Sequence, residues 1–337
     1  MIKFTRICVP LSLDCNLHCR YCYRERERLD KIPEFTEDMK EYLGKVSPDW
    51  CESVVASGGE PLFHWDKVKE LFSYVPKNVH KKIMSNCTLL TQEMVDYINE
   101  NEIELLASHD GPQTEFLRGV DVLRNEKLCD LIRQVKILTV SCVVTKYNVD
   151  VWENYFDVVK HLKRLDFYYV INSVNDVVPE MQYLVDGFDY DKWYETKVGF
   201  LFSPFNFKHP WYKGRTLKNY TPKPGFYVGY NLLPDGTVTG MIRIKSKYGT
   251  IHDDKETCRE NSMKSGLMDR CIQTKCKYIG RCNALLQHTS EHACKCYQTE
   301  MEKGTVEYKE KMFNYVNNHL DEIVAKYFPE FAESMKK

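Results

Sequence analysis

Three cysteines lie close together near the start of the chain, at Cys15, Cys19 and Cys22 in the stretch DCNLHCRYCYR. Three thiolates on one short loop can bind three irons of a 4Fe-4S cluster and leave the fourth iron open to another ligand. A structural zinc site normally takes four protein ligands, and the nearest further candidate, His18, lies inside the same tight loop. Chance clustering of inert thiols fits poorly with the polar and basic neighbours of these cysteines. The spacing therefore favours an iron-sulfur cluster with one open iron.

A second group of cysteines lies in the C-terminal half of the chain. It comprises Cys271, Cys276, Cys282, Cys294 and Cys296, with Cys258 further upstream. Four thiolates are enough to complete the coordination of one 4Fe-4S cluster, and a zinc ribbon with four cysteine ligands is the alternative. The other cysteines are scattered singly, so we expect them to pack as small apolar side chains.

Composition and charge exclude several classes of partner. The 337-residue chain carries a formal net charge of −1, with basic and acidic residues mixed throughout. No overall field attracts nucleic acid or an anionic membrane, and we expect neither as a partner. No apolar run approaches the roughly 18 residues that span a bilayer, and the N-terminus lacks the pattern of a secretory signal. We therefore expect a cytoplasmic protein whose clustered cysteines bind metal rather than form disulfides.

Short apolar strands alternate with amphipathic helices over roughly the first 175 residues. The predicted strands are Thr5–Leu13, Ser53–Ser57, Lys81–Ser85, Ile103–Ser108, Val135–Thr145 and Asp166–Val174. The predicted helices are Glu37–Lys45, Trp65–Tyr74, Gln92–Glu100, Gly119–Arg133 and Val151–Leu165. This alternation predicts an α/β fold in which a parallel sheet with right-handed crossovers curls into a partial (β/α)6 barrel.

Polar, glycine-containing segments follow the first four predicted strands. The cysteine motif follows the first strand, SGGEP (Ser57–Pro61) the second, SNCTLL (Ser85–Leu90) the third and SHDGP (Ser108–Pro112) the fourth. The carboxyl ends of parallel strands meet at one edge of the sheet, where the chemistry of such folds collects. We therefore expect these four segments to form one site.

The opening motif resembles the signature of the radical S-adenosylmethionine (SAM) superfamily, CxxxCxxC with an aromatic residue, here Tyr21, before the last cysteine. The resemblance implies that Cys15, Cys19 and Cys22 hold a 4Fe-4S cluster and that SAM chelates the open iron. It further implies that the reduced cluster passes one electron to the sulfonium. A 5'-deoxyadenosyl radical then removes a hydrogen atom from the substrate.

The other segments match the superfamily in order and position. Gly58, Gly59, Glu60 and Pro61 match its GGEP motif, whose exposed backbone is implied to receive the amino group of SAM; glycine suits this role because a Cβ would prevent close approach. SNCTLL and SHDGP resemble the TNGTLL and SLDGP segments of the sulfatase-maturase branch. Asn86 and Ser108 are thereby implied to bind SAM, and Asp110 to lie near the substrate. Ordinary capping and turn roles are the alternative.

One departure from this branch is Cys87, which stands where glycine is usual. A cysteine near the radical can return a hydrogen atom to a substrate radical, as a peptide epimerase requires. The alternative is a small residue that fills a turn.

The C-terminal half resembles the SPASM domain and its shortened relative, the twitch domain, which hold auxiliary iron-sulfur clusters. GFYVGYNLLPDGTVTG predicts a hairpin, and it leads toward the second cysteine group. Cysteine ligands expected of a full SPASM domain are replaced by Met241, Asp254 and Leu286. The resemblance therefore implies one auxiliary 4Fe-4S cluster, held by Cys271, Cys276, Cys282 and one of Cys294 and Cys296.

We predict four parts: a radical SAM barrel over 1–180, an aromatic-rich connection over 181–225, a small α+β twitch-like domain over 226–300 and a C-terminal helix over 301–337. The last part reads as one amphipathic helix broken near Pro329. The connection has no clear helical or strand period and forms either a substrate-facing surface or a packed core.

The resemblance implies an oxidoreductase that modifies a peptide or protein and needs an external electron donor such as flavodoxin or ferredoxin. We expect a maturase of a ribosomally made peptide that performs crosslinking, epimerisation or a related reaction. Because the chain starts at the first strand, we expect leader recognition to use another protein or surface, or to be absent. A sulfatase-maturase-like or small-molecule radical SAM enzyme is the alternative within enzymes, and a non-catalytic zinc-binding module is the alternative outside them.

Overall fold

The computed structural model describes residues 4, 6–22, 29, 31–174, 177–201, 203, 205, 230–240, 246–262, 264 and 291–329. Its strands are β1 (Arg6–Ser12), β2 (Ser53–Gly58), β3 (Lys81–Ser85), β4 (Glu104–Ser108), β5 (Leu138–Val144), β6 (Tyr168–Ser173), β7 (Tyr230–Leu232), β8 (Thr237–Gly240) and β9 (Lys247–Thr250). They form one open sheet in the order β6-β5-β4-β3-β2-β1-β7-β8-β9. Neighbours from β1 to β6 are parallel. The predicted α/β architecture and the positions of its first six strands are confirmed.

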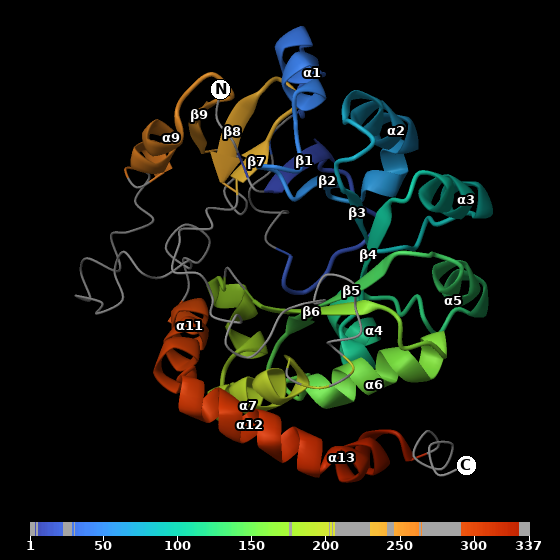
Figure 1. The fold of residues 1–337 in the computed structure, drawn as a ribbon, viewed down its shortest axis with the longest axis vertical. Helices are drawn as coiled ribbons and strands as arrows, with labels where there is room; N and C mark the ends of the chain where they lie inside the picture. Colours follow the sequence, from blue (N-terminus) through green and yellow to red (C-terminus); the bar gives the residue numbers. More distant parts are fainter. Residues whose placement is uncertain are drawn as a thin grey trace.

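The helices of the barrel are α1 (Glu37–Gly44), α2 (Trp65–Tyr74), α3 (Gln92–Glu100), α4 (Thr114–Arg118), α5 (Glu126–Arg133) and α6 (Val151–Leu162). Figure 1 shows α2, α3 and α5 on the outer side of the curved sheet. Side chains at Thr36, Thr91, Asn125 and Asp150 accept backbone hydrogen bonds at the starts of α1, α3, α5 and α6. The caps at Thr36, Thr91 and Asp150 explain why α1, α3 and α6 begin at their expected residues. The helix α2 also begins at its expected residue, although no side chain caps it.

The prediction of one helix over Gly119–Arg133 was wrong in its first half. Gly119 adopts a φ of +86° and ends α4, and Asn125 then caps α5. The residues between them form a turn in which Asp121 Oδ1 accepts the backbone hydrogen bonds of Leu123 and Arg124. Apolar spacing alone did not reveal this break because both flanking helices bury apolar side chains.

The aromatic segment after β6 contains a helix that the sequence pattern did not predict. A 3-10 helix, η3, covers Pro179–Leu184, and α7 covers Tyr190–Leu201. Trp193, Tyr194 and Phe200 of α7 are buried, and α7 packs against α6. The described part of this segment therefore serves as packed core, while 206–229 lie outside the described residues.

The predicted hairpin is confirmed and extends the barrel sheet. β7 and β8 pair antiparallel, and Gly236, with a φ of +82°, supplies the left-handed residue of their turn. Cys8 in β1 pairs in parallel with Asn231 in β7. The division of the chain into four parts stays a prediction, although this pairing joins the hairpin directly to the barrel.

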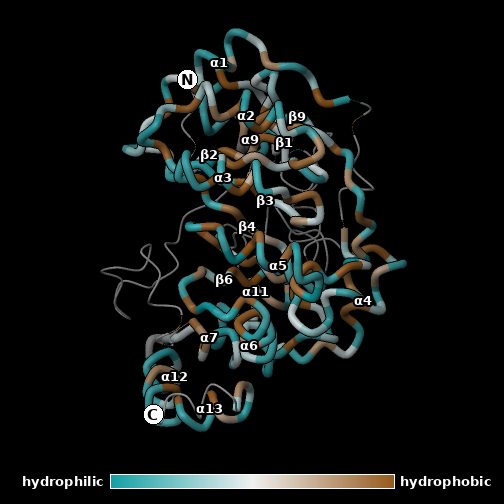
Figure 2. Tube along the Cα trace, turned by 90° about the vertical axis from the view of Figure 1, so that its right-hand side faces the viewer, coloured by the Kyte–Doolittle hydropathy of each residue, from teal (hydrophilic) through white to brown (hydrophobic). Residues whose placement is uncertain are grey.

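Two helices, α12 (Val306–Asn318) and α13 (Leu320–Tyr327), replace the single helix that we predicted over 301–337, and a further helix, α11 (Glu291–Lys303), precedes them. The breaks lie at Gly304 and His319, before Pro329, and Thr305 caps α12. α12 packs against α7 and α13 against α6, and Figure 2 shows both at one end of the molecule. None of the helices in the described segments has both the length and the apolar character needed to span a membrane.

Candidate active site

The cysteine motif lies on the loop that follows β1, and all three of its thiols are partly exposed. Burial raises the pKa of Cys15, and it raises that of Cys19 to about 11 against the opposing charge of Arg118. Each of these two thiols is also affected electrostatically by Cys22, so the three lie close together. Within the described residues, no group of three His, Cys, Asp or Glu side chains converges on a single metal ion. An iron-sulfur cluster does not require its ligands to converge on one point, because each thiolate binds a separate iron.

The loop after β2 lies directly against the loop after β1. Gly59 N donates to Ser12 O at 2.8 Å, and Glu60 N donates to Asp14 O at 2.7 Å. A Cβ at Gly58 would lie 2.2 Å from Ser12 O, and one at Gly59 would lie 2.2 Å from Asp14 O. Both glycines are therefore required for the two backbones to meet, which is a role that the sequence had assigned only to contact with SAM.

Glu60 connects the loop after β2 to the loop after β3. Its side chain is 1% exposed. Oε1 accepts from Ser85 Oγ at 2.8 Å and from Leu62 N at 3.0 Å, and Oε2 accepts from Asn86 N at 2.7 Å. Burial raises the pKa of Glu60, and these hydrogen bonds oppose the shift. Glu60 therefore holds Asn86 in place rather than facing a ligand.

Asn86 lies beside the cysteine loop, as the motif order predicted. Its Nδ2 donates to Asn16 Oδ1 at 3.0 Å and approaches Cys15 Sγ at 3.8 Å. Thr88 Oγ1 in turn accepts from Asn16 Nδ2 at 2.7 Å. Pro61 is buried at the start of a 3-10 helix, and Ser108 is half-buried at the end of β4.

Asp110 is wholly buried and holds the other side of the cysteine loop. Its Oδ2 accepts from Arg118 Nε at 2.8 Å and from the hydroxyl of Tyr21, and its Oδ1 accepts from Val143 N at 2.8 Å. Burial raises the pKa of Tyr21 well above its ordinary range, so the phenol stays protonated and donates. These contacts favour a positioning role for Asp110 over the substrate contact that we expected.

Sequence reasoning missed two residues of this network, Arg118 and His109. Arg118 Nη1 lies 4.0 Å from Cys19 Sγ. His109 is buried, accepts from Gly111 N at 3.2 Å through Nδ1, and contacts Asp121 at 3.1 Å through Nε2. The available signal was His109 itself, which stands in SHDGP where the resembled motif SLDGP has leucine.

Cys87 does not face the site. It adopts a φ of +62°, its side chain is fully buried in the main core, and its thiol lies 3.8 Å from Ser85 O. Burial raises the pKa of Cys87 to about 12. The predicted role as hydrogen donor stays a prediction, and the geometry favours the packing alternative.

The second cysteine group falls mostly outside the described residues, which exclude Cys271, Cys276, Cys282, Met241 and Leu286. Cys294 and Cys296 lie on α11. Cys296 is buried with its sulfur 3.6 Å from His292 Nε2, whereas Cys294 is half-exposed. Cys258 is also buried.

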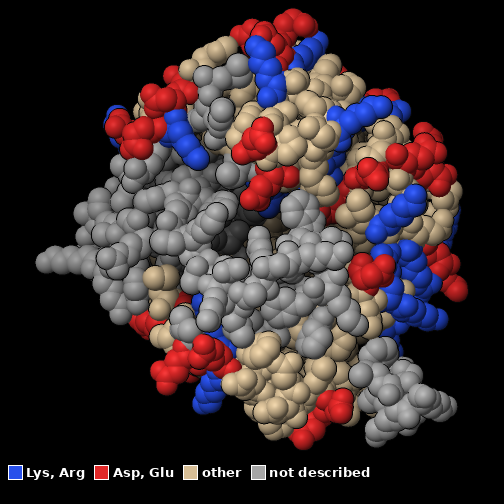
Figure 3. Space-filling model, in the orientation of Figure 1, with Lys and Arg blue, Asp and Glu red and all other residues tan. Residues whose placement is uncertain are grey.

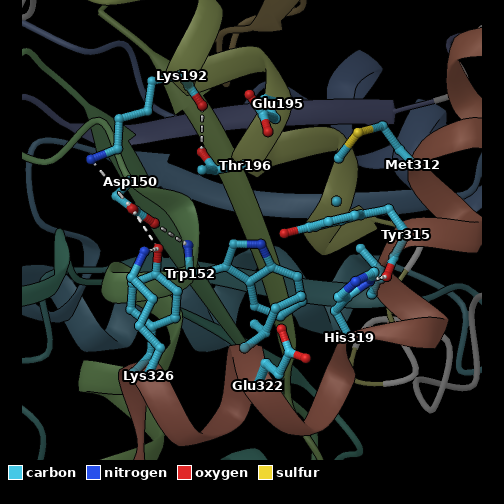
Figure 4. Close-up of a pocket in the computed structure, with 14 residues that line it drawn as sticks. Asp150, Trp152, Lys192, Glu195, Thr196, Met312, Tyr315, His319, Glu322 and Lys326 are labelled. Atoms are coloured by element: carbon cyan, nitrogen blue, oxygen red, sulfur yellow. Dashed lines mark hydrogen bonds and ion pairs between the residues drawn. The ribbon is translucent and has the colours of Figure 1, made fainter.

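Two cavities differ in their relation to the cysteine loop. One of about 400 Å³ borders it and is lined by Ser12, Asp14, His64, Leu11, Leu13, Leu29, Lys31, Ile32 and Lys67. Another of about 320 Å³ lies between α6, α7, α12 and α13, where Lys192 and Tyr327 contact Asp150 beside Trp152 (Figure 4). The cysteine loop contributes no residue to this second cavity. Figure 3 shows basic and acidic side chains interspersed on the visible described surface.

The donor set fits the cofactors that the motif implies. Three partly exposed thiols lie on one loop, and that loop is held between the backbone of Gly58–Glu60 and the Asp110 network. The family model for the Radical SAM superfamily matches residues 9–176, about half of the chain. This chain belongs to the radical SAM superfamily. Membership in this enzyme superfamily implies a 4Fe-4S cluster and SAM.

Two curated relatives are similar in sequence to part of this radical SAM enzyme. The cysteine-type anaerobic sulfatase-maturating enzyme of Clostridium perfringens (strain ATCC 13124) is 24% identical over 224 residues, covering 58% of this chain and 60% of that protein. The radical SAM cyclopropyl synthase TigE of Paramaledivibacter caminithermalis is 26% identical over 123 residues, covering 30% of this chain and 26% of the synthase. The matches thus span less than two thirds of either relative.

Solved structures share the fold over more of the chain. Native anSMEcpe with bound AdoMet and Cp18Cys peptide has a TM-score of 0.61 at 18% identity, covering 93% of this chain and 99% of that chain. Streptococcus suis SuiB bound to its precursor peptide SuiA has a TM-score of 0.55 at 16% identity, covering 91% of this chain and 75% of SuiB. The radical SAM enzyme described here therefore shares its architecture with both.

Proposed function

We propose that this radical SAM enzyme modifies a peptide or protein substrate at a site built on the loop after β1. The observation that carries the proposal is the fixation of this loop from two sides, by the backbone of Gly59 and Glu60 and by the Tyr21–Asp110 hydrogen bond. When bound, the cluster and SAM supply one-electron chemistry that removes a hydrogen atom from the substrate. A preorganised loop limits the movement of a reactive group relative to its substrate.

Different residues of the chain bind the cluster and SAM at this site. Cys15, Cys19 and Cys22 bind the cluster. Gly58 and Gly59 allow the backbone after β2 to lie beside the cysteine loop, and this backbone receives the amino group of SAM. Asn86, fixed through Glu60 and Asn16, and Ser108 supply polar contacts to SAM.

The peptide substrate is supported by the relatives. One curated relative is a sulfatase-maturating enzyme, and the structures of anSMEcpe and SuiB hold a peptide. We propose a ribosomally made peptide that undergoes crosslinking, epimerisation or a related modification. A sulfatase-type protein is the second candidate, favoured by the match to the maturating enzyme. The electron donor is proposed to be a small redox protein such as flavodoxin or ferredoxin, in the cytoplasm.

We further propose one auxiliary 4Fe-4S cluster held by Cys271, Cys276, Cys282 and Cys294. Cys294 is the better fourth ligand because its side chain is half-exposed, whereas Cys296 is buried. Replacing Cys294 by Ala is expected to remove about one cluster of iron, and replacing Cys296 is expected to leave the iron content unchanged. The reverse pattern would assign the ligand to Cys296.

The decisive experiment removes the three loop thiols together. Cys15→Ala, Cys19→Ala and Cys22→Ala in one protein should abolish 5'-deoxyadenosine formation after anaerobic reduction with dithionite, while the auxiliary iron remains. Cys129→Ala is the matched control, because this buried thiol lies on α5 and contacts His161 O. Unchanged nucleoside formation in the triple variant would contradict the assignment of the cluster.

The substrate class is tested by three parallel reactions that contain a peptide encoded by a neighbouring gene, a sulfatase peptide, or no addition. A mass shift on the first peptide together with increased 5'-deoxyadenosine is the expected result. Stimulation by the sulfatase peptide alone would move the assignment to a sulfatase-maturase-like enzyme.

A further inference from the structure

A buried ion pair lies directly behind the cysteine loop. Asp110 is 0% exposed and Arg118 is 8% exposed, and their side chains meet at 2.8 Å. The guanidinium of Arg118 remains protonated, because arginine is not deprotonated in proteins. A buried ion pair of this kind adds little net stability compared with apolar side chains of the same size. Its charges therefore call for an explanation other than stability.

The other end of the guanidinium approaches one of the three cysteines of the loop. Arg118 Nη1 lies 4.0 Å from Cys19 Sγ, and the guanidinium carbon lies 5.5 Å from the ring centroid of Tyr21. Tyr21 also donates to Asp110, so the three side chains fix the loop segment that carries Cys19 and Cys22. A positive charge at this distance from a partly buried thiolate attracts it electrostatically.

Reduction adds one negative charge to an iron-sulfur cluster, and nearby charges and hydrogen bonds to the cluster sulfurs shift its reduction potential. A positive group beside Cys19 stabilises the reduced state, whereas the carboxylate behind it acts in the opposite direction.

From this geometry we infer that Arg118 is a positioning residue that raises the reduction potential of the cluster through its contact with Cys19, and that Asp110 partly offsets this effect. The inference rests on the proposed function only in requiring a cluster at Cys15, Cys19 and Cys22. It explains why the third residue of the network, Tyr21, precedes the last cysteine: its ring and hydroxyl hold the ion pair against the loop.

The test is a redox titration monitored by electron paramagnetic resonance, with the anaerobically purified full chain and no SAM or substrate present during the titration. The signal that changes when SAM is added identifies the relevant cluster beforehand. For Arg118→Met we expect about a tenfold fall in the ratio of reduced to oxidised cluster at a fixed potential, which corresponds to about 59 mV for a one-electron couple. For Asp110→Asn, which keeps an acceptor for Arg118, we expect a rise in the same ratio.

Two further variants separate charge from structure. Arg118→Lys keeps the charge and should lie closer to wild type than Arg118→Met. Arg124→Met removes an equal charge from a half-exposed side chain that pairs with Asp121, and it should leave the ratio unchanged. If Arg118→Met fails to fold or to hold iron, Asp110→Asn alone decides, because a rise supports the inference and no change overturns it.

Shifts of Arg118→Met and Asp110→Asn in the same direction, or the wild-type ratio in both, would overturn the inference. A wild-type protein that holds no reducible cluster would instead refute the proposed function, so the two failures are distinguishable.

Discussion

Replacing Gly59 by Ala tests the contact between the loops that follow β1 and β2. An ideal Cβ at this position lies 2.2 Å from Asp14 O and 2.6 Å from Leu13 O. Real Cβ atoms are essentially never found within 3.0 Å of a heavy atom from elsewhere in the chain. Both atoms belong to the backbone and not to a flexible side chain, so the two loops must separate by about 1 Å, because close-packed interiors do not absorb such an overlap.

The cost follows from the interactions that this separation stretches. Gly59 N and Glu60 N donate to Ser12 O and Asp14 O at 2.8 and 2.7 Å, and each such hydrogen bond contributes about 1 kcal/mol. We therefore expect a loss of about 2 kcal/mol, which lowers the midpoint of thermal unfolding by about 3 °C. A displacement of about 1 Å at the cysteine loop should also reduce SAM cleavage by about 100-fold.

The assay measures thermal unfolding of the iron-free protein and 5'-deoxyadenosine formation by the reconstituted protein. Gly44→Ala is the matched control, because the nearest atom to its added Cβ is Tyr74 O at 3.9 Å. This control should stay within about 1 kcal/mol of wild type. Wild-type stability and cleavage in Gly59→Ala would refute the contact between the loops and the reasoning built on it.

Three further predictions concern buried groups outside the cysteine loop. Burial alone would raise the pKa of Glu104, but neighbours that include His80 lower it to about 2. A carboxylate with a lowered pKa stabilises the fold when the pH is above its pKa in the unfolded chain, and this stabilisation is lost as the pH falls toward its pKa in the folded protein. In denaturant titrations, the free energy of unfolding of the wild type should fall by about 1 kcal/mol more between pH 7 and pH 4 than that of Glu104→Gln. The same pH dependence in both proteins would contradict this prediction. Tyr327→Phe removes a 2.8 Å hydrogen bond to buried Asp150, so urea unfolding should show a loss of about 1 to 2 kcal/mol; no loss would argue against the packing of α13. Cys87→Ala should keep SAM cleavage and product formation while it loses about 1 kcal/mol of stability, and loss of product alone would instead support the hydrogen-donor role.

The positions of the first six strands could be predicted because their signal is local. Each is a short apolar run bounded by polar or glycine-containing segments, and the structure places β3 at the predicted Lys81–Ser85. The order of motifs along the chain then placed Gly59, Asn86 and Asp110 beside the cysteine loop, because the carboxyl ends of parallel strands share one edge. The helix α7 could not be found in this way, because its buried residues include the adjacent pair Trp193 and Tyr194 and therefore blur the helical period. The break at His319 was missed for the opposite reason: Met312, Val316 and Val324 on either side of it are all buried and keep the spacing of one continuous helix face.

The sequence by itself determined the chemistry: three thiols at the spacing of a cluster with an open iron, on a loop after the first strand of an α/β barrel. Only the tertiary structure decided what each neighbour does. Asp110 meets Tyr21 across 89 positions of the chain, and Arg118 meets Cys19 across 99 positions. Such pairings depend on how strands and helices pack, and no periodic pattern encodes them. For the same reason the sequence could not foresee that Gly59 lies against Asp14, and it could not decide between the two roles considered for Cys87, whose side chain lies in the core.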